Sequence, residues 1–208
     1  MLEQPLYALN DPADIRSLIA DRAWATLVSP FPNGGLTVSH LPVVLDPDRD
    51  DSTVLGHLAR TDAELHELGR HPVVLIIEGP NGYISPSFYQ SGPYVPTWNF
   101  VVAHLHGTPE LLGAQHTYDV LDKTVDHFES RRPNPWHLAE VDEYAQHIAP
   151  MTAGFRLAPT RTVGKAKISQ EKPRDIAQRV IQALERDDDI HSNRELAATM
   201  TRILPPSP

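Results

Sequence analysis

Short apolar runs, each ended by turn residues, recur along the first 170 residues of the chain. Four of them read as strands: AWATLVS at 23–29, LTVSHLPVVL at 36–45, TVLGHL at 53–58 and VVLIIE at 73–78. The turn PFPNGG joins the first two, and twenty prolines indicate further turns and edge strands. Strand patterning returns at 100–112 and at 152–167, where Pro159 interrupts it. Because strands and helices do not alternate strictly, we predict a mainly β (α+β) fold, a small antiparallel barrel with peripheral helices.

Helical patterns lie between these runs and after them. Asp11 and Pro12 are typical of the start of a helix, and apolar residues recur at helical spacing through 116–128. Capping boxes are expected at Thr61 with Glu64 and at Ser192 with Glu195. A shorter helix is expected within 137–148, and another from Pro173. We therefore expect one domain over 1–170 and a helical extension over 171–208, with the acidic segment 46–51 as a solvated hairpin end.

Composition limits the classes of function. The chain has no cysteine, which excludes thiolate nucleophiles and thiolate metal sites. No apolar run is long enough to span a membrane, and the N-terminus lacks the order of a signal peptide, so a cytoplasmic protein is expected. The net charge of −9, without a block of cations, disfavours direct DNA binding.

The segment 79–100, GPNGYISPSFYQSGPYVPTWNF, is expected to be a long loop that binds a flat polar ligand. Its hydroxyl groups and aromatic rings alternate from Tyr83 to Tyr89, and Thr97, Trp98 and Asn99 then offer a hydroxyl, a large ring and an amide. An aromatic ring covers a planar heterocycle, while amides and hydroxyls bond its edge. Packing of the same rings in a core or an interface is the alternative, and the residue types alone favour it.

Two other segments have the chemistry of an anion site. Residues 56–61, GHLART, run from a strand into a helix and combine free backbone N–H groups, a hydroxyl and a guanidinium, which suits a phosphate. A capped helix with a surface arginine is the alternative. Residues 164–170, GKAKISQ, place two lysines on one face of a strand end, where a solvated edge is the alternative.

Other chemistries find little support. Eleven histidines are present, but no HExxH motif or compact group of metal ligands occurs, so no metal site is expected. The serine-hydrolase elbow, the dinucleotide fingerprint and the P-loop are also missing. No catalytic residue is assigned.

Six segments, in this order along about 130 residues, resemble the PaiB family, also called the FMN-binding negative transcriptional regulators. They are HLP at 40–42, GHLAR at 56–60, GPNGYISPSFY at 79–89, VPTWNF at 95–100, PW at 135–136 and GKAKISQ at 164–170. The resemblance implies a split β-barrel of the flavin-reductase and pyridoxamine-phosphate-oxidase type. It also implies a homodimer with FMN at the subunit interface.

Carried over by motif, the resemblance implies three groups of FMN-binding residues. The first takes the phosphate and the ring edge, the second comes from the long loop, and the third approaches from the C-terminal strand. They are His57, Leu58, Ala59, Arg60 and Thr61; Ser85, Ser87, Thr97, Trp98 and Asn99; and Lys165, Lys167, Ser169 and Gln170.

The chain departs from the family pattern at four positions. Asn81, Phe88, Ala166 and Glu171 stand where the family usually has histidine, tryptophan, tryptophan and asparagine. The changes at 166 and 171 are expected to weaken flavin binding. Three functions therefore stay open: a negative transcriptional regulator acting directly or indirectly, an FMN-dependent oxidoreductase, and a split barrel that has lost flavin.

Overall fold

A computed structural model describes residues 1–30 and 34–204 of the protein. The tip of the expected turn PFPNGG, residues 31–33, lies outside the described residues. Eight strands are present in the described ranges: β1 (Trp24–Pro30), β2 (Leu36–Leu45), β3 (Val54–Ala59), β4 (Val73–Ile84), β5 (Thr97–Gly107), β6 (Glu110–Leu111), β7 (Thr152–Leu157) and β8 (Arg161–Lys167). They form one sheet in the order β6-β7-β3-β2-β1-β4-β5-β8, so the predicted antiparallel, mainly β fold is confirmed.

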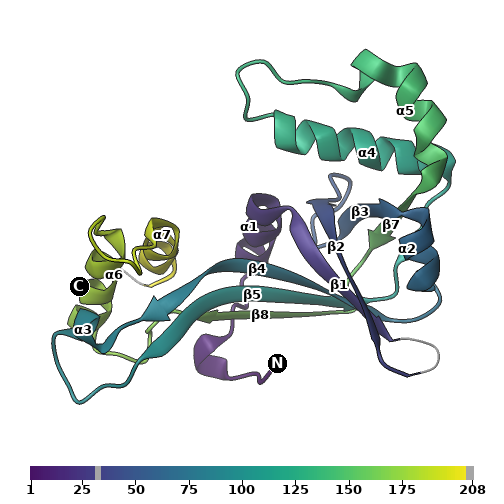
Figure 1. Ribbon diagram of the computed structural model, residues 1–208. Helices are drawn as coiled ribbons and strands as arrows, with labels where there is room; N and C mark the ends of the chain where they lie inside the picture. Colours follow the sequence, from purple (N-terminus) through teal and green to yellow (C-terminus); the bar gives the residue numbers. More distant parts are fainter. Residues whose placement is uncertain (31–33, 205–208) are drawn as a thin grey trace. The chain divides into compact units, whose positions relative to one another are not determined.

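Most of the helices lie in the expected parts of the chain, but a short helix at 86–89 lies in the segment predicted to be a loop (Figure 1). The helices are α1 (Pro12–Arg22), α2 (Arg60–Leu65), α3 (Pro86–Tyr89), α4 (Ala114–Glu129), α5 (Asp142–Ile148), α6 (Arg174–Glu185) and α7 (Arg194–Ile203), with three 3-10 turns, η1 (Pro5–Tyr7), η2 (Leu138–Val141) and η3 (Ala149–Met151). In the part of the chain that the structure covers, no helix is both long and apolar enough to cross a membrane.

The chain divides into two compact units. The larger unit comprises residues 11–77 and 104–162, and the smaller unit comprises residues 1–10, 78–103 and those from 163 onward. In the larger unit, β1 pairs with β2 from Trp24 opposite Pro42 to Pro30 opposite Leu36. Its α4 packs across β7, β3 and β2 (Figure 1).

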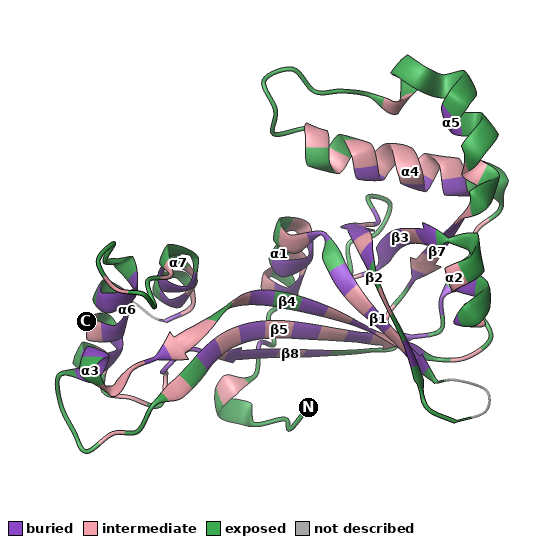
Figure 2. Ribbon diagram, viewed as in Figure 1, coloured by how far each residue is buried: buried purple, intermediate pink, exposed green. Residues whose placement is uncertain are grey.

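Alternation along the strands builds the core. In β1 and β2, Ala25, Leu27 and Leu41 are buried, while the residues between them are partly or fully exposed. Buried and partly exposed residues also alternate along β4 and β5 (Figure 2). Gly56 of β3 has a packing role, because a Cβ there would lie 2.5 Å from Cζ of Phe155.

Helix ends confirm one expected cap and correct two others. Asp11 caps α1, because its Oδ1 accepts a hydrogen bond from Ala13 N at 2.8 Å. At α2 the capping residue is Ala59, which makes no side-chain cap, so the capping box expected at Thr61 is wrong. At α7 the cap is Asn193, one residue after the expected Ser192, and its Oδ1 accepts from Leu196 N at 2.9 Å.

The expected long loop is shorter than predicted. β4 continues through residue 84, so the first six residues of the segment 79–100 are strand, and α3 follows almost at once. The extension is held within the smaller unit, where Trp98 Nε1 donates to Asn81 Oδ1 at 3.1 Å. Asn193 Nδ2 also donates to the carbonyl of Asn81 at 2.9 Å.

In the smaller unit, α6 and α7 lie side by side (Figure 1) and bury the apolar faces that the sequence predicted. Ile176, Val180 and Ile181 of α6 are buried, as are Leu196 and Met200 of α7. Gly82 lets α7 approach β4, since a Cβ there would lie 3.2 Å from Leu196 Cδ2.

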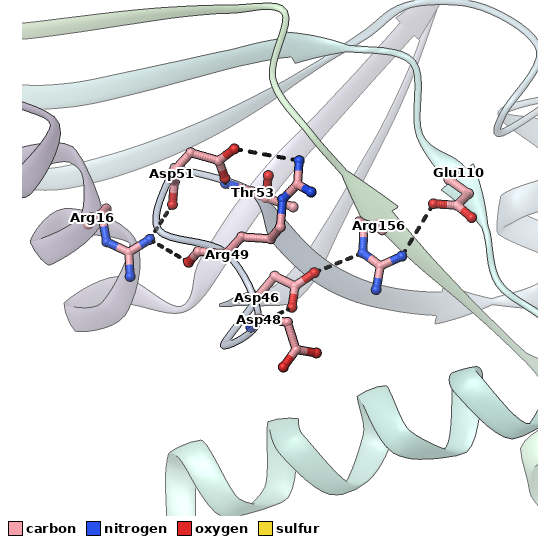
Figure 3. Close-up of polar contacts among 8 residues, drawn as sticks. All are labelled: Arg16, Asp46, Asp48, Arg49, Asp51, Thr53, Glu110 and Arg156. Carbon is pink, nitrogen blue, oxygen red and sulfur yellow. Dashed lines mark hydrogen bonds and ion pairs between the residues drawn. The ribbon is translucent and has the colours of Figure 1, made fainter.

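The acidic segment 46–51 belongs to the end of the β2–β3 hairpin, and residues 47–51 are exposed as predicted, whereas Asp46 is not (Figure 3). Asp46 is only 1% exposed, and its carboxylate accepts from Arg156 Nε at 2.8 Å and from Asp48 N at 3.1 Å. Arg16 donates to the carbonyls of Arg49 and Asp51 and fixes the rest of the segment. The correction follows from tertiary structure, because Arg156 is 110 residues away from Asp46 in the sequence.

Loss of Arg156 is expected to leave the Asp46 carboxylate buried without its main partner. The Arg156→Met variant should lose about 2–3 kcal/mol of unfolding free energy. This loss is at or below the lower limit of about 3 kcal/mol for breaking a fully buried ion pair, because Arg156 is partly exposed. Urea unfolding measures this loss. The control is Arg70→Met, since Arg70 makes only an exposed pair with Glu67 and should cost under about 0.5 kcal/mol. Equal losses in the two variants would contradict the assignment.

Candidate functional site

The segment 57–61 lies in the larger unit, at the junction of β3 and α2. Leu58 is buried, so only its backbone is available to a ligand, whereas the side chains of Arg60 and Thr61 are exposed. Arg60 Nε donates to the carbonyl of Pro150 at 2.6 Å, and its terminal nitrogen donates to the carbonyl of Thr152 at 2.7 Å. A guanidinium has five N–H donors. Arg60 thus fixes the start of β7 with two of them and keeps others for an anion.

The side chain of His57 is mostly buried, unlike those of Arg60 and Thr61. Burial lowers the pKa of His57, so the ring is neutral near pH 7. Its Nδ1 is buried and has no hydrogen-bond partner among the described residues. An unpaired buried nitrogen of this kind is costly, which marks His57 as a position where a ligand group is favoured.

The lowered pKa of His57 predicts a pH dependence of stability. The pKa of His57 in the folded state lies below its unfolded value of about 6.5. The contribution of the neutral ring to the unfolding free energy is therefore complete above about pH 6.5, and it is lost as the pH falls toward the folded-state pKa. The His57→Gln variant should therefore show a smaller loss of unfolding free energy between about pH 7 and pH 5.

Urea unfolding across this pH range tests the expectation. His66, His104 and His127 also have lowered pKa values through burial, so the slope should decrease without vanishing. His116→Gln, at an exposed position of α4, serves as the control. Identical slopes in wild type and His57→Gln would contradict the expectation.

The other predicted residues lie in the smaller unit, where Lys167 brings several of them together. Lys167 Nζ donates to Thr97 Oγ1 and, at 3.1 Å, to the carbonyl of Trp98. The Trp98 ring is 50% exposed. A cation, a hydroxyl and a large ring therefore meet at the start of β5, as the chemistry of a phosphate-bearing planar ligand requires.

Lys165, two residues before Lys167 in β8, is buried. Its Nζ donates to the carbonyl of Leu2 at 3.1 Å and to Gln4 Oε1 at 3.2 Å. The same ammonium lies within 6 Å of the ring centroids of Tyr7 (5.6 Å) and Phe100 (5.9 Å). Lys165 thus anchors the N-terminal segment and is not the solvated edge that its spacing alone favours.

Asn99 and Ser169 are fully buried and bonded to each other. Asn99 Nδ2 donates to Ser169 Oγ at 2.9 Å, and Met200 Sδ of α7 lies 3.6 Å from the same nitrogen. The backbone of Ser169 is left-handed (φ 67°). The side chain of Gln170 supports this turn, because its Oε1 accepts a hydrogen bond from Ile168 N at 2.7 Å and its Nε2 donates to the carbonyl of Ala166 at 2.6 Å. In this structure these three residues hold the end of β8 in place beside Lys167.

Ser85 and Ser87 form a hydroxyl pair at the start of α3. Their Oγ atoms are 2.7 Å apart, and Ser85 Oγ also accepts from Ser87 N at 3.2 Å. Ser87 is exposed, so this helix start presents hydroxyl groups at the surface.

A hollow of about 480 Å³ adjoins Trp98 in the smaller unit. Tyr83 and His191 line it with their ring centroids 4.8 Å apart, and Asn193 completes its wall. The sequence pattern did not identify His191 or Asn193, because both come from the segment between α6 and α7. The cap position of Asn193 was the only available signal.

The departures from the PaiB pattern have local explanations. Ala166 is only 2% exposed, so this backbone leaves little room for a tryptophan. Burial raises the pKa of Tyr7, and the negative charge of Glu171 and its hydrogen bond to Tyr7 raise it further. Glu171 also pairs with Lys172 at 3.7 Å. Its charge is therefore partly offset within the protein. The residues present fit a flavin phosphate, because Lys167 donates only to the neutral oxygens of Thr97 and Trp98, so no carboxylate offsets its charge in these bonds.

Residues 1–161 match the protein-family model described as "Putative FMN-binding domain". Since this match covers most of the chain, the protein belongs to that family. It is similar to Protease synthase and sporulation protein PAI 2 of Bacillus subtilis, with 23% identity over 186 residues that cover 88% of each chain. The resemblance to the PaiB family is confirmed.

Two solved structures show the fold. The flavocytochrome Anf3 from Azotobacter vinelandii has a TM-score of 0.59 at 17% identity, covering 83% of this chain and 75% of that one. The FAD and heme binding protein from Mycobacterium smegmatis has a TM-score of 0.57 at 16% identity, covering 81% and 77%. The predicted split-barrel fold is confirmed.

Proposed function

We propose that this protein binds FMN as a cytoplasmic homodimer of PaiB type, with the flavin at the subunit interface. The observation that carries the proposal is the group at the start of β5, where Lys167 holds Thr97 and the backbone of Trp98 beside an exposed indole ring. The family match supports FMN, and the names of the two neighbours, a flavocytochrome and an FAD and heme binding protein, support a flavin. Bound FMN would supply one- and two-electron redox chemistry.

In this proposal the chain's own residues bind and orient the cofactor. Lys167 attracts the phosphate, and Thr97 and Ser87 add hydroxyl donors. Trp98 covers the ring system. Asn99, Ser169 and Gln170 act by fixing the strand ends that carry Lys167 and Trp98. Arg60 and Thr61 of the larger unit are a separate group of donors, and residues 190–193 of the C-terminal extension line the hollow next to Trp98.

Removal of the Lys167 ammonium should weaken FMN binding at least tenfold, because a charge-assisted contact contributes about 1.5–3 kcal/mol. The Lys167→Met variant tests this, with affinity measured by quenching of FMN fluorescence. Lys123→Met in α4 is the matched control and should bind as wild type does. An unchanged dissociation constant for Lys167→Met would remove this lysine from the site, and failure of wild type to retain FMN on gel filtration would refute the cofactor.

The outward face of the larger unit's sheet supports the dimer. Val38 opposes Val28, and Val28 opposes Val74 on its other side, so one row of the face is entirely valine. Leu36 is 71% exposed and Val38 is 53% exposed. An antiparallel sheet that faces water is normally polar on that side, so this face is expected to be covered by a second copy.

A charge on this face should break the dimer. We expect Val38→Asp to be monomeric by gel filtration with light scattering, because burial of a carboxylate in an apolar interface is costly. Tyr144→Asp, at an exposed position of α5, should remain dimeric and controls for the added charge. A dimeric Val38→Asp protein would place the interface elsewhere. Circular dichroism verifies that both variants fold.

If the protein is a negative regulator of transcription, it acts through a partner protein or through flavin chemistry in this proposal. The net charge of −9 supports an indirect route over direct contact with DNA.

A further inference from the structure

A second cavity, of about 620 Å³, lies entirely within the larger unit. Three aromatic side chains line it, Trp24 of β1, Phe128 of α4 and Trp136, together with the aliphatic Leu121, Val125 and Ile148. Its size is within the range of small-molecule sites, which are mostly apolar with a few placed polar groups.

The charges around this cavity exclude an anionic ligand. Among the described residues that line it there is no lysine or arginine, and Glu129 is the one carboxylate. Glu129 is held in place, because its oxygens accept from Trp136 N at 3.0 Å and from Arg132 at 3.3 Å. A phosphate would therefore meet apolar walls and a like charge, without a cation to offset its desolvation.

One polar group at the cavity is unsatisfied. His57 lines it, and His57 Nδ1 is buried without a partner among the described residues. His57 thus places a polar ring on a mostly apolar wall, with which a ligand group can form a hydrogen bond.

We propose that this cavity binds a neutral, planar aromatic molecule of one or two rings, with one hydrogen-bonding group directed at the His57 ring. The three aromatic side chains select a flat apolar body, and Glu129 rejects negative charge. The proposal rests on the cavity alone and holds whether or not the protein binds FMN.

The probe is 2-naphthol, titrated calorimetrically into the full-length protein without FMN and again with excess FMN. We expect saturable binding of 2-naphthol in the absence of FMN. The anionic 2-naphthoate, of similar shape, should bind at least tenfold more weakly. No binding of 2-naphthol up to its solubility limit, or equal affinity for 2-naphthoate, would overturn the proposal.

Variants locate the site. Ala149→Trp fills the cavity and should weaken 2-naphthol binding at least tenfold, whereas Ala139→Trp, one exposed position of η2 outside the lining, should stay within twofold. Val125→Phe provides a second filling variant if the first fails to fold by circular dichroism. His57→Leu should weaken binding at least fivefold. Wild-type affinity in the folded filling variants, or in His57→Leu, would overturn the assignment.

Discussion

Side chains alternate between the two faces of an antiparallel strand, and in β1, β2 and β4 each face carries apolar residues. Leu27, Leu41 and Leu75 fill the core, while Val38 and its neighbours form the opposite face. A sheet that is apolar on both sides needs a cover on each. The hydrophobic core covers one face, and the other face underlies the proposed dimer. Closure of the core also fixes the ends of β3, where the motif GHLAR is found.

Several other buried polar groups form hydrogen bonds within the protein. His66 bonds Ser29 through Nδ1 at 2.6 Å and Ser39 through Nε2 at 2.9 Å. Asp46 has Arg156, and Asn99 has Ser169. The Nδ1 of His57 has no such partner among the described residues, and neither do Thr53 Oγ1, His71 Nε2 and Tyr89 Oη. Of these four residues, His57 lines the cavity of the larger unit.

Electrostatics separates the two kinds of ligand chemistry in this protein. The start of β5 combines an ammonium group, hydroxyls and a half-exposed indole, which suits an anionic planar cofactor. The cavity of the larger unit is apolar and carries a carboxylate, which suits a neutral ring. A protein of net charge −9 concentrates phosphate only where specific donors offset its overall field.

Periodicity, turn residues and motif order determined the strands, most helices, the antiparallel fold and the family, because these depend on neighbouring residues and on spacing. Tertiary structure decided the rest. Asp46 is buried because Arg156, 110 residues further on, reaches it. Asn99 became a buried support because Ser169 and Met200 cover it. His191 joined the aromatic hollow because α6 and α7 fold back on the smaller unit. No local pattern records these contacts, since each depends on chain segments that only folding brings together.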